Sequence, residues 1–315
     1  MIDITLQNLE TDLVQASIDT PVLLDIWAPW CGPCRQLGPL LEKLEVAYAG
    51  RFILAKLNSD DQPDIAGQLS QAFGVRSIPF CVMFVGGQPV DGFVGALPEA
   101  QIREFLDKHV PSADELAAGE EAEVAEQLAA EGDTDSALTK LGDALAIAPH
   151  DDAIRADYVK RLLEAGLTAE AQQAYGPLAP KAIADARASA LGLWLEACLS
   201  ASASTARSAE QLAAAIASDR RDFAARFERA QALLAGQHFT EAMDELLEIL
   251  MRDKAWSEQR ARKLYVAILE LLTKPAPKPA AAEAKGTLEI AGKTATVATD
   301  PVLDSYRRKL SMVLF

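Results

Sequence analysis

Over residues 1–110, segments with the apolar pattern of a β-strand alternate with segments that have the apolar pattern of an α-helix. An apolar run at 21–28, interrupted only by Asp25, is typical of a buried strand, whereas apolar side chains three and four apart over 33–50 predict an amphipathic helix that closes on Gly50. This order of patterns continues and predicts an α/β domain, in which helices cover a sheet of parallel strands and one antiparallel hairpin. The further elements are a second strand, a second helix, a hairpin turning at two glycines and a closing helix, at 51–60, 64–75, 80–95 and 98–110.

From about residue 112 onward, strand patterns disappear and helices rich in Ala, Leu and Glu follow one another. Three positions of the segment 132–151 recur 34 residues later, and a unit at 236–253 has the same pattern in a shifted register. Thirty-four is the tetratricopeptide period, in which small residues let paired helices approach closely. Unrelated Ala-rich helices in a bundle are the alternative, and 181–220, which fits the period poorly, predicts an irregular pair. The recurring positions are Gly132 and Gly166, Ala137 and Ala171, and Leu141 and Tyr175.

The end of the chain changes pattern again. Residues 273–284 are rich in Pro and Ala and predict an extended linker, and the weak alternation over 286–300 fits either a small hairpin or a loose segment. Asp300 and Pro301 then form a helix start, because an N-cap residue is followed by proline. The helix that follows has one apolar face, formed by Leu303, Tyr306, Leu310 and Val313 or Leu314. We therefore expect four parts, 1–111, 112–272, 273–300 and 301–315, the last an amphipathic helix.

The composition and charge of the chain argue against two classes of function, nucleic-acid binding and membrane insertion. The 315 residues carry a formal net charge of −16, which argues against nucleic-acid binding because phosphate contacts require clustered Lys and Arg. No apolar run approaches the ~20 residues of a membrane span, and the N-terminus lacks the pattern of a signal peptide. We therefore expect a cytoplasmic protein without membrane contact. In a reducing compartment, a closely spaced pair among the four cysteines indicates redox or metal chemistry.

Such a pair, Cys31 and Cys34, lies where the first long strand meets the first long helix, in the segment DIWAPWCGPC. The dipole and the free N–H groups of a helix N-terminus stabilise a thiolate, so we expect Cys31 to be the attacking nucleophile. Cys34 lies one turn inside the helix, and we expect it to be shielded and to resolve the mixed disulfide. Gly32 and Pro33 fix the turn between the two cysteines.

Asp25 lies six residues before Cys31 on the predicted buried strand. Burial disfavours a charged carboxylate, so we expect a raised pKa for Asp25. A carboxyl group of this kind can exchange a proton with Cys34 while that thiol resolves the mixed disulfide. Lys56 on the next strand is either an ordinary strand lysine or, if it lies beside Asp25, a residue that modulates the proton affinity of that carboxylate.

The remaining cysteines and two tryptophans have less specific contexts. Cys81 is either a buried strand thiol or an accessory redox thiol near the pair, and Cys198 suits helix packing. Trp27 suits the core, whereas Trp30, adjacent to Cys31, suits shielding of the thiol. A zinc site would need two further ligands, and the three histidines form no companion pattern, so no metal is expected.

Further features accompany the motif WCGPC, namely Asp25, Pro39, Lys56, Pro79 and Gly95. Together they make residues 1–110 resemble thioredoxin. The resemblance implies a disulfide reductase that needs no cofactor besides the redox-active Cys31–Cys34 disulfide, and a cis Pro79 that faces this disulfide. It also implies that the Ile78 backbone pairs with a substrate strand. The substrate-binding residues that it implies are Trp30, Gly32, Pro33, Ile78, Pro79 and Gly95.

The thioredoxin-like domain, the helical repeats and the ending YRRKLSMVLF together resemble the CnoX/YbbN family, the chaperedoxins. That resemblance implies a holdase that binds unfolding or oxidised client proteins, protects their cysteines and delivers them to a GroEL-type chaperonin. It also implies thioredoxin reductase as the recycling enzyme. The chaperonin-docking element of the family is the C-terminal helix, which implies partner contacts by Tyr306, Arg307, Arg308, Leu310, Leu314 and Phe315.

Two other functions fit the same sequence. One is a plain protein-disulfide reductase whose repeats recruit a dedicated partner, and the other is a non-catalytic adaptor. The C-terminal helix also has an alternative role, because helical arrays need terminal caps and this helix could fold back on the last repeat. Docking is favoured by the linker at 273–284, and the basic triplet 307–309 would steer the helix towards an acidic partner. The two roles could also alternate.

Overall fold

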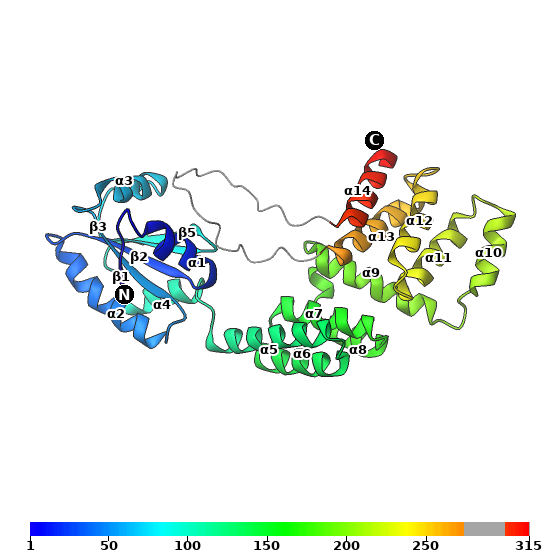
Figure 1. Ribbon diagram of the computed structural model, residues 1–315, viewed down its shortest axis with the longest axis horizontal. Helices are drawn as coiled ribbons and strands as arrows, with labels where there is room; N and C mark the ends of the chain where they lie inside the picture. The colour runs from blue at the N-terminus through cyan, green and yellow to red at the C-terminus, as the bar shows by residue number, and fades with distance from the viewer. Residues whose placement is uncertain (274–299, 315) are drawn as a thin grey trace. The chain divides into compact units, whose positions relative to one another are not determined.

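The computed structural model describes residues 1–273 and 300–314, which form two compact units (Figure 1). The first unit ends at Leu116, and the second contains the helices that follow, including the C-terminal helix. The linker and hairpin predicted within 273–300 lie outside the described residues, apart from Thr273 and Asp300, and so does Phe315. The predicted fold class, an α/β domain followed by an all-helical domain, is confirmed.

The first unit is built on a five-stranded sheet with the order β1-β3-β2-β4-β5. The strands β1, β3 and β2 are parallel, whereas β4 runs antiparallel to β2 and forms the predicted hairpin with β5. The central strand β2 is buried from Val22 to Ile26 because other strands flank it and helices cover both of its faces. The strands are β1 Ile2–Asp3, β2 Val22–Trp27, β3 Ile53–Asn58, β4 Phe80–Val85 and β5 Gln88–Val94.

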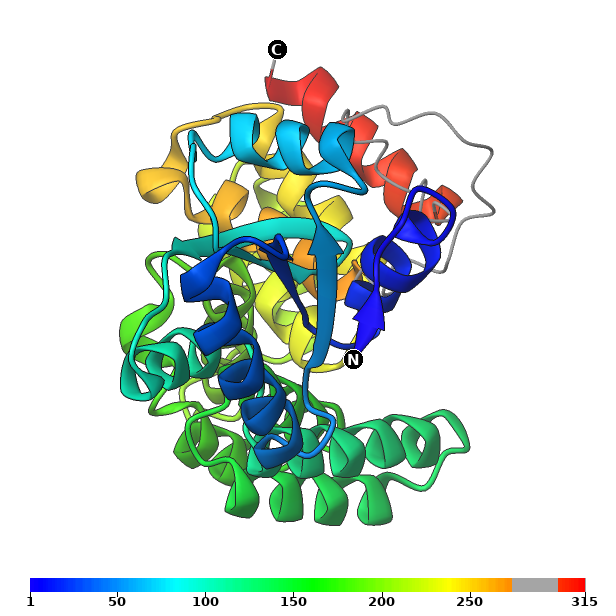
Figure 2. The ribbon, with the colours of Figure 1, turned by 90° about the vertical axis from the view of Figure 1, so that its left-hand side faces the viewer.

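Two sets of helices cover the two faces of the sheet, because successive strand residues point to opposite sides. Leu23 and Met83 pack with α2 and α4, whereas Leu24 and Val82 pack with the N-terminal helical segment and α3. Figure 2, which faces this unit, shows α2 on one side of the strands and α1 on the other. The helical elements are η1 Leu9–Gln15, α1 Ala16–Asp19, α2 Gly32–Ala47, α3 Pro63–Ala72 and α4 Glu99–Asp107.

The second unit begins within α5, which is joined to α6 by an ion pair of Lys140 with Glu121, and α7 and α8 form the next pair of helices. Gly132 lies in the turn of the first pair and Gly166 in the turn of the second, with φ of +89° and +75°. Glycine adopts this left-handed conformation without steric strain, so the 34-residue offset marks the same turn in successive pairs. The helices are α5 Ala113–Ala130, α6 Thr134–Ile147, α7 Asp152–Glu164, α8 Thr168–Tyr175, η2 Ala179–Lys181, α9 Ala186–Ala201, α10 Ala209–Ser218, α11 Phe223–Ala235, α12 Phe239–Leu250, α13 Trp256–Leu272 and α14 Pro301–Leu314.

A small residue lets α8 approach α9 closely. A Cβ atom at Gly192 would lie 2.3 Å from the Tyr175 hydroxyl oxygen, so a larger side chain does not fit without movement. The Tyr175 hydroxyl donates a hydrogen bond of 2.9 Å to the carbonyl of Ala188. Beyond α8 the helices no longer pack in regular successive pairs, as the poor periodicity of 181–220 predicts. Helix α9 packs against α7, α11 and α13, while α10 packs against α11.

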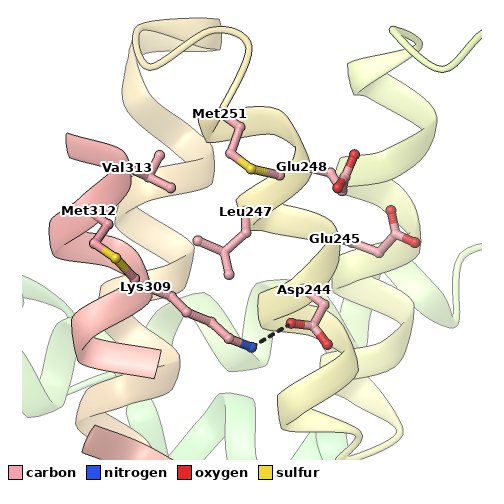
Figure 3. A pocket seen from close by; sticks show the side chains of 8 residues that line it. All are labelled: Asp244, Glu245, Leu247, Glu248, Met251, Lys309, Met312 and Val313. Atoms are coloured by element: carbon pink, nitrogen blue, oxygen red, sulfur yellow. Dashed lines mark ion pairs between the residues drawn. The ribbon is translucent and has the colours of Figure 1, made fainter. Parts of the chain in front are cut away.

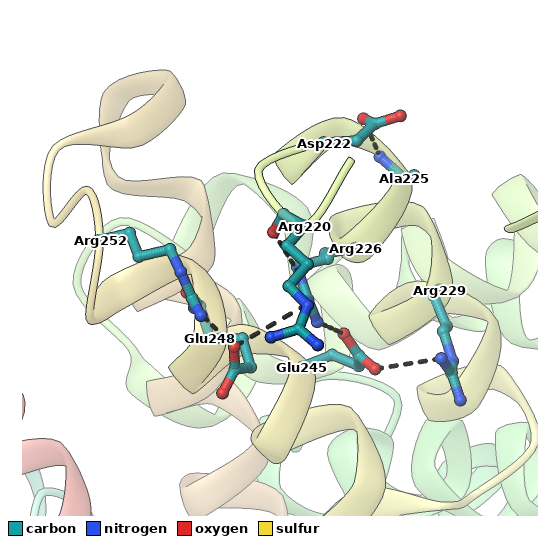
Figure 4. Close-up of polar contacts among 8 residues, drawn as sticks. All are labelled: Arg220, Asp222, Ala225, Arg226, Arg229, Glu245, Glu248 and Arg252. Carbon is teal, nitrogen blue, oxygen red and sulfur yellow. Dashed lines mark hydrogen bonds and ion pairs between the residues drawn. The ribbon is translucent and has the colours of Figure 1, made fainter. Parts of the chain in front are cut away.

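A buried charge network joins α11 to α12 (Figure 4). The Arg226 side chain is only 9% exposed and donates hydrogen bonds to Glu245, at 2.6 Å, and to the Arg220 carbonyl, at 3.1 Å. The other carboxylate oxygen of Glu245 pairs with Arg229 at 3.2 Å. Arg226 and Glu245 are the least exposed members of this network, and their hydrogen-bonded ion pair fixes the position of α11 against α12.

Candidate functional site

The cysteine pair lies at the junction of β2 and α2 and forms a disulfide. Cys31 is the N-cap residue of α2, and its Sγ accepts a hydrogen bond of 3.2 Å from the backbone N–H of Cys34. Gly32 and Pro33 begin the helix between them, and Pro33 suits this position because it has no N–H to leave unpaired. A sulfur atom at a helix N-terminus is in an environment that stabilises the thiolate once the disulfide is reduced.

The two cysteines differ in their bonding rather than in their depth. Each is 4% exposed in the disulfide form, so the structure does not show the greater shielding that the sequence led us to expect for Cys34. The difference lies in the backbone, because Cys31 caps the helix while Cys34 lies inside its first turn and donates its N–H to the Cys31 sulfur. The helix N-terminus therefore acts on Cys31, which favours this residue as the thiolate.

Asp25 lies at the centre of a row of side chains across three strands. Its strand pairs it with Lys56 of β3 on one side and with Cys81 of β4 on the other. Asp25 is 1% exposed, and burial raises the pKa of its carboxyl from 3.8 to about 6, as predicted in direction. The positive charge of Lys56 and a hydrogen bond from Cys81 lower the pKa of Asp25 in part, while the negative charge of Glu42 raises it. Such a carboxyl group can take up and release a proton near neutral pH.

Lys56 is held by α2 rather than by Asp25. Its ammonium forms an ion pair and a hydrogen bond with the carboxylate of Glu42, and its side chain is 15% exposed. Lys56 therefore acts on Asp25 through its charge and not through a hydrogen bond. Sequence reasoning missed Glu42, which lies 14 residues before its partner, because the approach of α2 to β3 is not visible in either segment alone.

The segment before β4 lies next to the disulfide. The peptide bond between Ile78 and Pro79 is cis, and the Ile78 side chain packs against the cluster that contains Cys31 and Cys34. The Pro79 carbonyl accepts a hydrogen bond of 2.8 Å from the N–H of Gly95. Gly95 has a φ of +88°, which glycine adopts readily, and this bond connects the end of β5 to the proline.

Trp30 is the most exposed large side chain of the motif, at 68%. Its indole N–H donates to both carboxylate oxygens of Asp60, at 3.0 and 3.2 Å, and this contact holds the ring to the segment that follows β3. Sequence reasoning did not identify Asp60, although the acidic stretch directly after β3 was a signal that could have indicated it. Trp27, by contrast, is partly buried and packs against the cluster around Cys31.

Neither a metal cluster nor a membrane span is found in the part of the chain that the structure describes. Over residues 1–273 and 300–314, no group of three or more His, Cys, Asp or Glu side chains is arranged to hold a metal ion. The helices in the same ranges include none with the length and apolar content that a bilayer crossing requires. Cys198, the cysteine farthest along the chain, is buried in the helical core.

The C-terminal helix α14 packs on α12 and α13. Leu303 and Tyr306 are buried, and Leu310 and Val313 pack against the same core, so the predicted apolar face lies against the repeats. This arrangement is the alternative in which the helix caps the last repeat. It leaves Leu314 half-buried at the end of the described helix.

Polar contacts add to this packing, and two basic residues stay at the surface. The Tyr265 hydroxyl donates to the Tyr306 carbonyl at 2.9 Å, and the Tyr306 hydroxyl donates to Asp244 at 3.2 Å. Arg307 and Arg308 are exposed. The residues predicted for partner contacts are thus divided between an inner, apolar side of α14 and an outer, basic side.

A groove with an apolar floor lies between α12 and α14 (Figure 3). Both methionines that line it are largely exposed, Met251 at 54% and Met312 at 75%. Exposed methionines suit varied apolar partners because their side chains are flexible and polarizable. The groove is lined by Leu247, Met251, Met312 and Val313, with Asp244, Glu245, Glu248 and Lys309 around them.

Comparison with known proteins agrees with this geometry. Residues 1–108 match the family model for thioredoxin, and 128–192 and 202–291 match two models for tetratricopeptide repeats. A thioredoxin of Chlorobaculum thiosulfatiphilum is 46% identical over 104 residues, which are 33% of this chain and 91% of that protein. Thioredoxin 1 of Nostoc sp. is 45% identical over 92 residues, 29% of this chain and 82% of that protein. The chain therefore belongs to the thioredoxin family, and tetratricopeptide repeats follow its thioredoxin domain.

Proposed function

We propose that the protein is a chaperedoxin, a holdase that binds unfolding proteins, reduces their disulfides and delivers them to a GroEL-type chaperonin. The observation that carries this proposal is the presence of a thioredoxin-type cysteine pair and a tetratricopeptide array in one chain. The first part makes the chain a thioredoxin-type protein-disulfide reductase. The second provides a surface for protein partners, and the proposal is that non-native chains are among these partners.

The reaction starts from the reduced protein. The Cys31 thiolate attacks one sulfur of a client disulfide, so a mixed disulfide forms and the first client thiolate leaves. Asp25, as carboxylate, accepts the proton of Cys34, whose thiolate then attacks the Cys31 sulfur. The Cys31–Cys34 disulfide forms and the second client thiolate leaves, which transfers two electrons to the client. Two electrons from a reductase of the thioredoxin reductase type restore the dithiol, so the protein needs no bound cofactor.

The client backbone is proposed to lie along Ile78. Among the described residues, no main-chain hydrogen bond outside the regular elements involves the N–H or the carbonyl of Ile78. Both groups are therefore available to an extended client segment, which would add to the protein as a short strand. Trp30, Gly32 and Pro33 would form the surface on which the client disulfide approaches Cys31.

Holding is assigned to the second unit. The groove between α12 and α14, with Met251 and Met312 exposed, offers an apolar surface that can adapt to different segments. Chaperonin docking is assigned to α14. Arg307 and Arg308 are exposed for electrostatic steering, whereas contacts by Tyr306 and Leu310 would require α14 to leave α12 and α13.

A double variant, Cys31→Ser with Cys34→Ser, separates reduction from holding. We expect it to lose the reduction of insulin while it still suppresses the aggregation of a heat-unfolded client that has no cysteines. Continued insulin reduction would reject the assignment of the cysteine pair. If the wild-type protein fails to suppress aggregation, holding is rejected, and a reductase whose repeats recruit one dedicated partner becomes the better explanation.

Charge reversal tests chaperonin docking without removing the packing of α14. We expect Arg307→Glu with Arg308→Glu to weaken binding to the chaperonin severalfold, because rim charges act mainly on association. The matched control reverses two exposed cations of α13, Arg262→Glu with Lys263→Glu, and should bind as the wild type does. Equal binding of the chain and of a variant lacking 301–315 would reject docking by this helix.

A further inference from the structure

The Asp25 carboxylate has a neighbour that the proposed reaction does not use. Cys81 lies directly opposite Asp25 in the antiparallel ladder of β2 and β4, and its Sγ is 3.7 Å from Asp25 Oδ1. Cys81 is fully buried and is not part of a disulfide. The ladder fixes this contact, since both side chains project from paired strand positions to the same face of the sheet.

A buried carboxylate needs hydrogen-bond donors, because each unpaired oxygen loses its hydration on folding. In the oxidised protein, the charged or titratable groups that act on Asp25 are Lys56 from β3, Glu42 from α2 and Cys81 from β4. The ammonium of Lys56 is bonded to Glu42. Within residues 1–273 and 300–314, the side-chain hydrogen bond to Asp25 therefore comes from Cys81 alone.

We propose that Cys81 is a positioning residue whose S–H donates to Asp25 and so orients the carboxylate that accepts the proton of Cys34. The role of Asp25 as proton acceptor rests on the proposed function. The hydrogen bond itself does not, so the two can be tested apart. Cys81 touches neither the client nor the reacting sulfur atoms in this role, and it acts only through Asp25.

The environment of Cys81 keeps it a donor. Burial and the charge of Asp25 both raise the pKa of the Cys81 thiol well above its usual value, so the sulfur keeps its proton over the working range of pH. A protonated thiol is a poor nucleophile and a poor metal ligand. The structure therefore favours the positioning role over the accessory redox role that the sequence left open for Cys81.

The hydrogen bond from Cys81 also shifts the pKa of Asp25 in a defined direction. A donor stabilises the charged carboxylate and lowers its pKa, against the effect of burial. Without the donor, the pKa of Asp25 should rise, and resolution by Cys34 should need a higher pH. Hydrogen bonds to charged groups are strong, and a thiol is a weak donor, so we expect a rise of about half to one pKa unit.

The test measures the Asp25 carboxyl by carbon-13 NMR titration of the oxidised full-length chain, with the signal assigned by Asp25→Asn. Cys81→Val removes the donor and keeps an apolar side chain, whereas Cys81→Ser keeps a donor. Met83→Leu is the matched control, because Met83 is equally buried two residues along the same face of β4. We expect a higher midpoint in Cys81→Val, a midpoint near or below that of the wild type in Cys81→Ser, and no change in Met83→Leu.

The proposal is overturned if Cys81→Val moves the Asp25 midpoint no further than Met83→Leu does. Cys81→Ala also lacks the donor and replaces Cys81→Val if the larger side chain prevents folding. The pH profile of insulin reduction provides the second readout, and its alkaline shift in Cys81→Val should equal the shift in the NMR midpoint. An NMR shift without a change in the kinetic profile would retain the hydrogen bond but reject Asp25 as the proton acceptor.

Discussion

Replacing Asp25 by asparagine should stabilise the first unit at alkaline pH. The folded protein holds the pKa of Asp25 near 6, whereas the carboxyl has its ordinary value of 3.8 in the unfolded chain. The folded state therefore binds the proton more tightly, and the free energy of unfolding falls as pH rises from about 4 through about 6. A difference of about two pKa units corresponds to about 3 kcal/mol at pH 8.

An asparagine side chain at this position is neutral at every pH and avoids this penalty. We expect Asp25→Asn to raise the free energy of unfolding by up to about 3 kcal/mol at pH 8 and by little below pH 4, where Asp25 is protonated in both states. Because the effect belongs to one unit, the assay must report on each unit separately. Two methionines allow this, since Met83 is fully buried in the first unit and Met243 in the second.

The measurement is oxidation of these methionines by hydrogen peroxide after equilibration in urea, read by mass spectrometry at pH 4, 6 and 8. The urea midpoint of Met83 oxidation should increase in Asp25→Asn at pH 8 and converge on the wild-type midpoint at pH 4. The Met243 midpoint serves as an internal control and should not change. An equal gain at pH 4 and pH 8 would mean that packing and not charge is responsible, and no gain at pH 8 would refute the raised pKa.

Three further predictions concern other parts of the molecule. Arg226→Ala should destabilise the second unit by about 1.5–3 kcal/mol, because Glu245 loses its buried partner and keeps only the more exposed Arg229, whereas Arg229→Ala should have little effect, as urea midpoints would show. Tyr306→Ala should remove about 3 kcal/mol of packing energy between α14 and the repeats, so that amide hydrogen exchange of α14 becomes faster. Unchanged exchange would contradict the capping role. Cys34→Ser should trap clients on Cys31 as mixed disulfides that a reductant releases, and recovery of equal amounts on a Cys31→Ser control would reject Cys31 as the nucleophile.

Much of the fold could be predicted because burial leaves a direct pattern in the sequence. The apolar run at 21–28 became β2, and the helix expected over 33–50 became α2, whose Leu37, Leu41 and Leu44 face the sheet. The first twenty residues were less informative. Strand β1 has only two residues and exists through its pairing with β3, and the helical segment Leu9–Asp19 buries few of its side chains.

The site was predictable only where its parts are close in sequence. Cys31, Cys34 and Asp25 lie within ten residues, and their roles follow from one strand–helix junction. The contact of Trp30 with Asp60 joins residues 30 positions apart, and that of Asp25 with Cys81 joins residues 56 apart. Such contacts depend on strand register and helix placement, which no local pattern contains.

The C-terminal helix illustrates a different limit. Its apolar face was readable from the spacing of Leu303, Tyr306 and Leu310, but the same face suits docking on a partner and capping of the array. The structure places this face on α12 and α13. A sequence pattern predicts that an apolar face is covered, and it does not identify what covers it.

Titration of the Cys31 thiol is the measurement on which the redox assignment depends. The reduced chain is alkylated with iodoacetamide across a range of pH, and the rate at Cys31 is followed by peptide mass spectrometry. Because Cys31 caps α2 and accepts the Cys34 N–H, we expect a midpoint near the value of about 7 usual for thioredoxins. A midpoint at or above about 8.5, the value of free cysteine, would contradict thiolate stabilisation by the helix and with it the role of Cys31.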